Sequence, residues 1–202
     1  MIDFVATFIV FFAVIDPIGT VPVFIAVTRH LDARARRRVA LRATFAAAVI
    51  LVFFVVAGEI ILISLDIPLS AFQIAGGIVL FLFALSMIFG ESKPEQEMQL
   101  AQNGHDTAIF PLSVPSIASP GAMLAAVILT ENSRYSIIEQ AQTTATMLLV
   151  LVVTYVMMLL ASVIHRIVGS SGASIISRIM GLILASVATK NTLAGIDSYF
   201  GL

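Results

Sequence analysis

The chain has 202 residues, of which 59% are hydrophobic and 11% are charged, and its mean hydropathy is +1.06. A soluble domain carries about 25% charged residues, so this composition excludes a soluble globular protein and predicts a polytopic membrane protein with one membrane domain over 1–202. The net charge of −1 argues against a nucleic-acid partner, and the absence of cysteine excludes disulfides and thiolate metal sites.

The apolar segments predict six transmembrane helices in an all-α fold, at about 20 residues per span. We expect these spans at residues 4–28, 39–63, 70–90, 108–130, 139–165 and 174–196. The first segment carries Asp3 and no Lys or Arg ahead of it, unlike the basic leader of a signal peptide. We therefore interpret it as a retained first helix.

Basic residues predict how the spans are oriented. The loop 29–42 holds six of the eleven Lys and Arg residues, namely Arg29, Arg34, Arg36, Arg37, Arg38 and Arg42. Such an excess is typical of a cytoplasmic loop that lies among anionic lipid headgroups. With six spans, both termini then lie outside. The polar segment 91–107, which includes His105 and Asp106, reads as a cytoplasmic linker between two halves of the chain.

Two predicted spans contain residues that should break a helix. The first carries Asp16-Pro17-Ile18-Gly19-Thr20-Val21-Pro22, and the fourth carries Pro115-Ser116-Ile117-Ala118-Ser119-Pro120-Gly121. A proline inside a helix costs about 3 kcal/mol, and lipid offers no water to satisfy the freed carbonyl groups. We expect helices 1 and 4 to be broken near the midplane, at 16–22 and 115–121. Non-helical backbone at this depth normally lines a polar cavity or is buried in protein, which makes the two breaks the candidate binding site.

The two halves of the chain show a weak internal similarity. Offsets of 102 to 104 pair Thr28 with Thr130, Pro17 with Pro120, and Gly77 with Gly181. Repeat one would cover about 1–90 and repeat two about 108–202. Because each repeat has three spans, an odd number, the second must be inverted relative to the first, as in many secondary transporters. Chance alignment of hydrophobic segments is the alternative explanation.

Each predicted break offers groups that could hold a small solute. Asp16 before Pro17 and Ser119 before Pro120 both read as a helix cap followed by proline at the first helical position. The half-helices that start there expose amide donors and the positive end of a helix dipole, which suit a carboxylate. The predicted substrate-binding residues are Asp16, Pro17, Gly19, Thr20, Pro22, Ser113, Pro115, Ser116, Ser119, Pro120 and Gly121. Their hydroxyls would orient the solute, and the glycines would let it approach the backbone.

Asp16 is the only carboxylate near the middle of a predicted span. A charge at a helix centre costs about 2.5–3.5 kcal/mol on insertion scales, so the residue is expected to be paired or functional. Three roles remain open: capping its own half-helix, attracting a substrate ammonium, or taking up a proton during transport.

Other polar or small residues within the spans have structural explanations. Glu59 and Lys190 are expected near the outer ends of their spans, where they would reach the interface or pair with each other. The pair Gly76-Gly77, and Gly181, are expected to be close helix-packing surfaces. Asn191 and Thr192 are candidates for lining an outer vestibule.

The chain resembles the MarC family of small inner-membrane proteins, which belongs with the LysE-type amino-acid exporters in a broader superfamily. The resemblance rests on Asp16-Pro17-Ile18-Gly19 with Pro22 and Phe24, and on Phe110-Pro111-Leu112 leading to Pro115 and Pro120-Gly121. It covers essentially the whole chain and implies transport of neutral amino acids such as alanine and glycine. Ser119 departs from the family pattern, in which a glycine commonly precedes the Pro-Gly pair.

The sequence therefore predicts a secondary transporter of a small zwitterionic solute, with proton coupling through Asp16 as a further hypothesis. The alternatives are an exporter of a metal ion or small inorganic anion and a membrane protein without transport activity. We expect no enzyme activity, since no Gly-x-Ser-x-Gly or His-Glu-x-x-His motif is present, and we expect no cofactor and no resident metal site. Besides the solute, the expected partners are membrane lipid and, because thin spans leave little room for a wide cavity, a second copy in a homodimer.

Overall fold

The computed structural model describes residues 3–89, 108–132 and 134–201, and within this part every regular element is a helix. The linker predicted at 91–107 lies outside the described residues. In chain order the elements are α1 (Phe4–Ile15), α2 (Pro17–Thr28), α3 (Ala33–Ser64), α4 (Leu69–Phe89), η1 (Ala108–Ile117), α6 (Pro120–Ile128), α7 (Ile137–Leu159) and α8 (Ala161–Phe200). The all-α membrane fold predicted from the sequence is confirmed.

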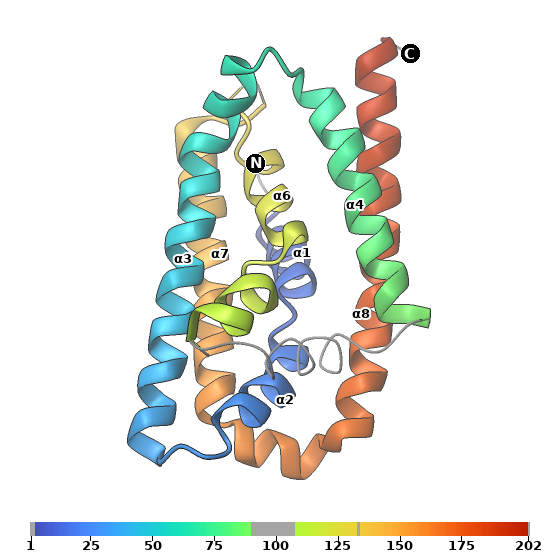
Figure 1. The fold of residues 1–202 in the computed structure, drawn as a ribbon. Coiled ribbons are helices and arrows are strands. Elements are labelled where there is room, and N and C mark those ends of the chain that lie inside the picture. Colours follow the sequence, from blue (N-terminus) through green and yellow to red (C-terminus); the bar gives the residue numbers. More distant parts are fainter. Residues whose placement is uncertain (1–2, 90–107, 133, 202) are drawn as a thin grey trace.

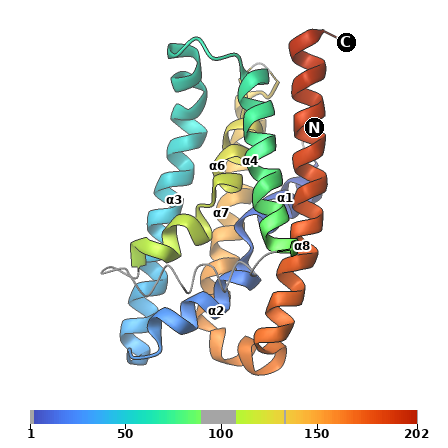
Figure 2. The same cartoon turned by 45° about the vertical axis from the view of Figure 1, so that its right-hand side comes forward.

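The short helices occupy the centre of the molecule. Figure 1 shows α1, α2, η1 and α6 between two pairs of long helices, α3 with α7 on one side and α4 with α8 on the other. The turned view in Figure 2 shows the same arrangement, with η1 crossing the long helices at mid-height. The polar side chains that the sequence placed at the breaks lie in the interior, where Asp16, Thr20, Ser116 and Ser119 are buried.

The first break is narrower than predicted. Asp16 alone separates α1 from α2, because its backbone adopts the left-handed region (φ 50°, ψ 69°), and the chain resumes a helix at Pro17. An aspartate tolerates this conformation better than most residues do. Pro22, expected inside the break, instead lies within α2 and is buried. Proline inside a membrane helix is tolerated when neighbouring protein groups satisfy the backbone around it.

The second break is wider and bends the chain. η1 has the wide turns of a π-helix and contains two residues with extended backbone, Phe110 and Val114, each directly before a proline. Proline disfavours the helical conformation of the residue before it, which explains the extended backbone at Phe110 and at Val114. Residues 118–119 then separate η1 from α6, and the two segments meet at 49°. Broken helices 1 and 4 are therefore present in the structure, and the inverted-repeat relation between the halves stays a prediction.

Glycines hold the α4–α8 pair together. A Cβ atom on Gly77 would lie 2.3 Å from Oγ1 of Thr192, and one on Gly181 would lie 3.0 Å from Cβ of Met87. Gly76 of α4 likewise faces the side chain of Leu124, which belongs to α6. The helices approach so closely because these positions have no side chain. The expectation that these glycines pack helices together is confirmed.

The fifth predicted span ends earlier than expected, whereas the sixth begins where it was predicted, since its membrane-length segment is Ser174–Phe200. α7 ends at Leu159 rather than near 165, and α8 starts at Ala161 and continues to Phe200 with a kink at Gly169 (φ 65°). The loop predicted at 166–173 is thus largely helical. Nothing in the sequence around 160 signals a turn, because neither proline nor glycine occurs there.

Among the described residues, five helical segments are long and apolar enough to cross a membrane, and η1 with α6 form a sixth when the bent pair is counted as one span. The two described ends of the chain lie at the end of the bundle opposite the loop between α2 and α3 (Figure 1). In the first turn of α3, Arg36 donates hydrogen bonds from Nε to the carbonyl of Thr28 (3.0 Å) and from its guanidinium to the carbonyl of Arg29 (3.2 Å). It thereby satisfies carbonyl groups at the C-terminus of α2.

Candidate functional site

Asp16 lies at the centre of the site and is held by groups from three directions. Its Oδ1 accepts a hydrogen bond from the backbone N–H of Gly19 (2.9 Å), which is the cap predicted for α2. Its Oδ2 accepts one from the Ser177 hydroxyl of α8 (3.1 Å). Its carbonyl oxygen accepts a third, from the Thr20 hydroxyl (3.0 Å). Only 2% of Asp16 is exposed, so a carboxylate at membrane depth is surrounded by donors from the protein itself.

Thr20 joins the first broken helix to the second. Its Oγ1 lies 3.1 Å from Oγ of Ser116 in η1. Either hydroxyl could be the donor in this pair, and Thr20 also donates to the carbonyl of Asp16.

Ser119 makes the second connection between the breaks. Its hydroxyl donates to the carbonyl of Val14 (2.7 Å) and accepts from the N–H of Ala122 (3.1 Å). The Val14 carbonyl belongs to the last turn of α1. Because the helix is broken after Ile15, this carbonyl has no N–H partner within the helix. One side chain therefore caps α6 and also satisfies a carbonyl that the other break sets free.

Ser113 connects the second break to α3 by donating a hydrogen bond to the carbonyl of Ala43 (3.0 Å). Close approach is possible because α3 presents the small side chains of Ala40, Ala43 and Ala47 on this face, and all three are fully buried. We name the polar side chains gathered here the break cluster. It consists of Asp16, Thr20, Ser113, Ser116, Ser119 and Ser177, none of them more than 2% exposed.

The remaining predicted site residues surround the break cluster in different ways. Gly19 leaves room for Asp16, because a Cβ there would lie 2.1 Å from Oδ2 of that residue. Pro17 is buried at the start of α2, while Pro115 is half-buried in η1 and Pro120 is exposed. Gly121 is buried, and a Cβ on it would lie 2.6 Å from Cδ1 of Leu80. In this conformation the space that both glycines provide is filled by protein side chains.

Sequence reasoning missed Ser177. It lies 161 positions from Asp16 in the chain, and only the packing of α8 against α2 brings the two together. One signal was present: Ser177 precedes Gly181 by four residues, so both small side chains share the helix face that packs inward.

Two hollows lie on either side of the break cluster. A cavity of about 120 Å³ is bounded by Val14, Gly121 and residues of α4 and α8, including Lys190 and Asn191. A second, of about 180 Å³, lies toward the α2–α3 loop and is bounded by Phe24, Arg36 and Met158, among others.

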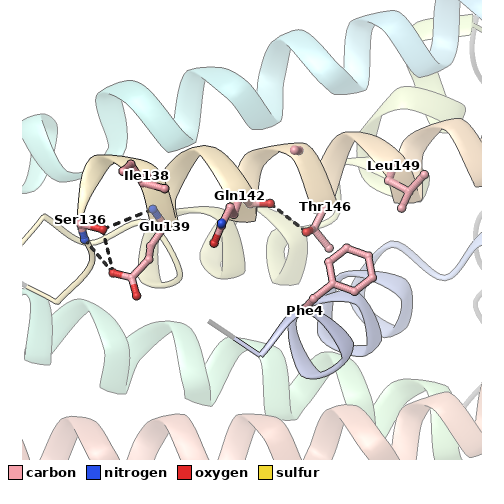
Figure 3. Close-up of a pocket in the computed structure, with 8 residues that line it drawn as sticks. Phe4, Ser136, Ile138, Glu139, Gln142, Thr146 and Leu149 are labelled. Atoms are coloured by element: carbon pink, nitrogen blue, oxygen red, sulfur yellow. Dashed lines mark hydrogen bonds between the residues drawn. The ribbon is translucent and has the colours of Figure 1, made fainter. Parts of the chain in front are cut away.

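A larger hollow than these two, of about 850 Å³, lies elsewhere, between the start of α1 and one face of α7. Figure 3 shows Phe4 of α1 facing Gln142, Thr146 and Leu149 of α7. The dashed lines at Ser136 and Glu139 mark the cap of α7, and the one between Thr146 and Gln142 marks the hydrogen bond from the Thr146 hydroxyl to the Gln142 carbonyl. None of the residues that line this hollow belongs to the break cluster.

The suggested pairing of Glu59 with Lys190 does not occur. Glu59 Oε2 instead accepts a hydrogen bond from the backbone N–H of Asn132 (2.8 Å), in the loop between α6 and α7. Within the described part of the chain, Lys190 forms no ion pair, and the ion pair that is present joins Arg134 to Glu131 (3.7 Å).

The fold and the break cluster together define an α-helical multi-pass membrane protein in which two interrupted helices meet at a buried polar centre. The chain belongs to the MarC family: the model of the "MarC family integral membrane protein" matches residues 1–200.

Curated relatives match over nearly their whole length. The chain is 30% identical to a UPF0056 membrane protein of Buchnera aphidicola over 99% of both chains. It is 31% identical to the UPF0056 inner membrane protein YhgN of Escherichia coli over 97% of both. It is 34% identical to a UPF0056 membrane protein of Methanocaldococcus jannaschii over 96% of this chain and 95% of the other. No solved structure matches the chain.

Proposed function

We propose that the protein is a secondary transporter of small neutral amino acids of the alanine and glycine kind, which works by alternating access. The observation that carries this proposal is the break cluster, because it joins the two interrupted helices through Thr20–Ser116 and Ser119–Val14 contacts. Interrupted helices that meet inside a membrane protein are the usual place for a transported solute.

The chemistry of the breaks suits a zwitterion. A carboxylate would be bound by N–H groups at the starts of α2 and α6, where the helix dipoles are positive. An ammonium group would be attracted by Asp16 and by carbonyl groups freed at the breaks. Because the break cluster is at most 2% exposed, a solute enters only when the helices around it move apart. The hollows of about 120 and 180 Å³ on its two sides are consistent with access from alternate ends.

We further propose that the protein lies in the cytoplasmic membrane with the Arg-rich loop 29–42 inside and both termini outside. The relative in Escherichia coli is named an inner membrane protein, which supports the location. The excess of arginine at the α2–α3 end supports the orientation. Rocking of one predicted repeat against the other would alternate the access.

The test is an uptake screen in proteoliposomes with labelled neutral amino acids, run with and without a pH gradient. We expect uptake of alanine or glycine by the wild-type protein. Absence of uptake of every neutral amino acid, together with movement of a metal ion or inorganic anion, would instead favour the alternative exporter.

Proton coupling through Asp16 is tested in the same assay with Asp16→Asn. We expect the substitution to abolish the pH dependence of uptake, since an amide cannot exchange a proton in this range. Asp3→Asn is the matched control: Asp3 caps α1 through Val5 N–H (2.9 Å) but is exposed, so this variant should keep the wild-type pH profile. Transport by Asp16→Asn with an unchanged pH dependence would exclude the coupling role.

A further inference from the structure

Lys190 is an exposed residue of α8 that borders a small cavity. Ten residues, or about 15 Å at 1.5 Å per residue, separate it from the end of the membrane-length segment Ser174–Phe200. Thr192, two residues further, packs against Gly77 in the interior of α4. Within the described residues Lys190 forms no ion pair, so its ammonium can pair with an anion that enters the cavity it borders.

The cavity beside Lys190 has one polar wall. Lys190 and Asn191 line it on the α8 side, and the other walls are apolar side chains such as Val10, Val14 and Leu80. Among the described residues that line the cavity there is no carboxylate, and Lys190 is the one that carries a charge.

The cavity also borders the break cluster and is small. Val14, whose carbonyl accepts the Ser119 hydroxyl, forms part of its wall, and so does Gly121 in the first turn of α6. Its volume of about 120 Å³ equals about four water molecules, at about 30 Å³ each. Drug-sized ligands need about 300–1,000 Å³, so this space admits only a very small solute.

We infer that this cavity, on the terminal side of the break cluster, binds the carboxylate group of the transported solute before that group reaches the N–H groups at the starts of α2 and α6. The ammonium of Lys190 supplies the counter-charge, and the side-chain amide of Asn191 supplies a hydrogen-bond donor. This inference rests on the proposed function and adds a residue that selects for a carboxylate. A small zwitterion enters with its carboxylate toward Lys190, whereas a solute with only an amine is repelled.

The first test measures occupancy without transport. The chain has two lysines, Lys93 and Lys190, so mass spectrometry can follow acetylation of Lys190 with Lys93 as internal reference. The protein is reconstituted in phosphatidylcholine vesicles, and the probes are propionate and its neutral isostere propionamide. At a propionate concentration about ten times the half-protection value, acetylation of Lys190 should slow about tenfold, and propionamide should have no effect.

Two results of this experiment would overturn the inference. One is equal acetylation of Lys190 with and without propionate. The other is protection that appears only when phosphatidylglycerol is added to the vesicles and that propionate does not change, because the occupant would then be a lipid phosphate.

The second test measures uptake of labelled alanine by Lys190→Gln, with Lys190→Arg and Arg178→Gln as comparisons. We expect Lys190→Gln to raise KM by about tenfold or more with a smaller change in maximum rate. Lys190→Arg should restore most of the affinity. Arg178→Gln removes an exposed cation from the same helix and should leave KM unchanged.

The two tests separate failure of the inference from failure of the proposed function. Protection of Lys190 by propionate in a protein that transports no amino acid would keep the carboxylate site and remove the proposed function. Uptake of alanine by Lys190→Gln with the wild-type KM would keep the function and remove the site.

Discussion

Ser119 is the side chain whose removal tests most directly whether the two breaks act as one unit. Ser119→Ala deletes the hydroxyl that donates to the Val14 carbonyl (2.7 Å) and accepts from the Ala122 N–H (3.1 Å). The volume hardly changes, and the site is fully buried. The variant therefore removes two hydrogen bonds without opening a large cavity.

The expected cost is the sum of a helix cap and a bond between helices. Loss of an N-cap serine costs about 1 kcal/mol, and a hydrogen bond between membrane helices contributes about 0.6 kcal/mol on average. The total of about 1.5 kcal/mol corresponds to a fall in Tm of about 3–6 °C for a chain of this length.

Ser136→Ala is the matched control, because Ser136 caps α7 in the same manner but is exposed and bonds to no other helix (Figure 3). It should lower Tm by about 2–4 °C, for the loss of a cap alone. Ser119→Gly adds a second comparison, since glycine at an N-cap costs only a few tenths of a kcal/mol and this variant isolates the bond to Val14. The melts are followed by far-UV circular dichroism in detergent, because the chain has no tryptophan.

Uptake of labelled alanine is measured on the same variants. We expect Ser119→Ala and Ser119→Gly to change the uptake rate, because the contact between the breaks is lost, and Ser136→Ala to leave it unchanged. If Ser119→Gly melts like the wild type and transports alanine at the wild-type rate, the Ser119–Val14 hydrogen bond does not couple the two breaks. The claim that the breaks act as one unit is then refuted.

Two further predictions concern packing and orientation. Gly77→Leu should prevent close packing of α4 on α8, since even a Cβ would lie 2.3 Å from Thr192 Oγ1. We expect this variant to lose the peak of folded protein on size-exclusion chromatography. Val79→Leu, at an exposed position of the same helix, should elute as the wild type does. Because the chain has no cysteine, His30→Cys and Tyr199→Cys can each be labelled alone in intact cells with an impermeant maleimide. We expect labelling at 199 and none at 30, and the opposite pattern would reverse the proposed orientation.

The breaks could be predicted from the sequence because their causes are local. Proline removes a backbone donor at its own position, and Asp16 and Ser119 cap N–H groups three residues ahead. Such effects depend on neighbours in the chain and not on packing. For the same reason, the apolar segments predicted the membrane fold and most helix ends to within a few residues.

The width of the first break and the turn at Leu160 could not be predicted in this way. Pro22 looked like part of the break but lies inside α2, where it is buried by packing that the local sequence does not report. At Leu160 the chain turns without a proline or glycine, so packing of α7 and α8 against the remaining helices decides where the turn falls.

By itself the sequence determined that two membrane helices are interrupted, where they are interrupted and which capping side chains lie there. Only the tertiary structure decided the partners of those side chains: Ser177 with Asp16, Ser119 with Val14, and a small cavity beside Lys190. The physical reason is distance along the chain. A cap reaches three residues, whereas these partners are 105 to 161 positions apart and meet only when the helices pack.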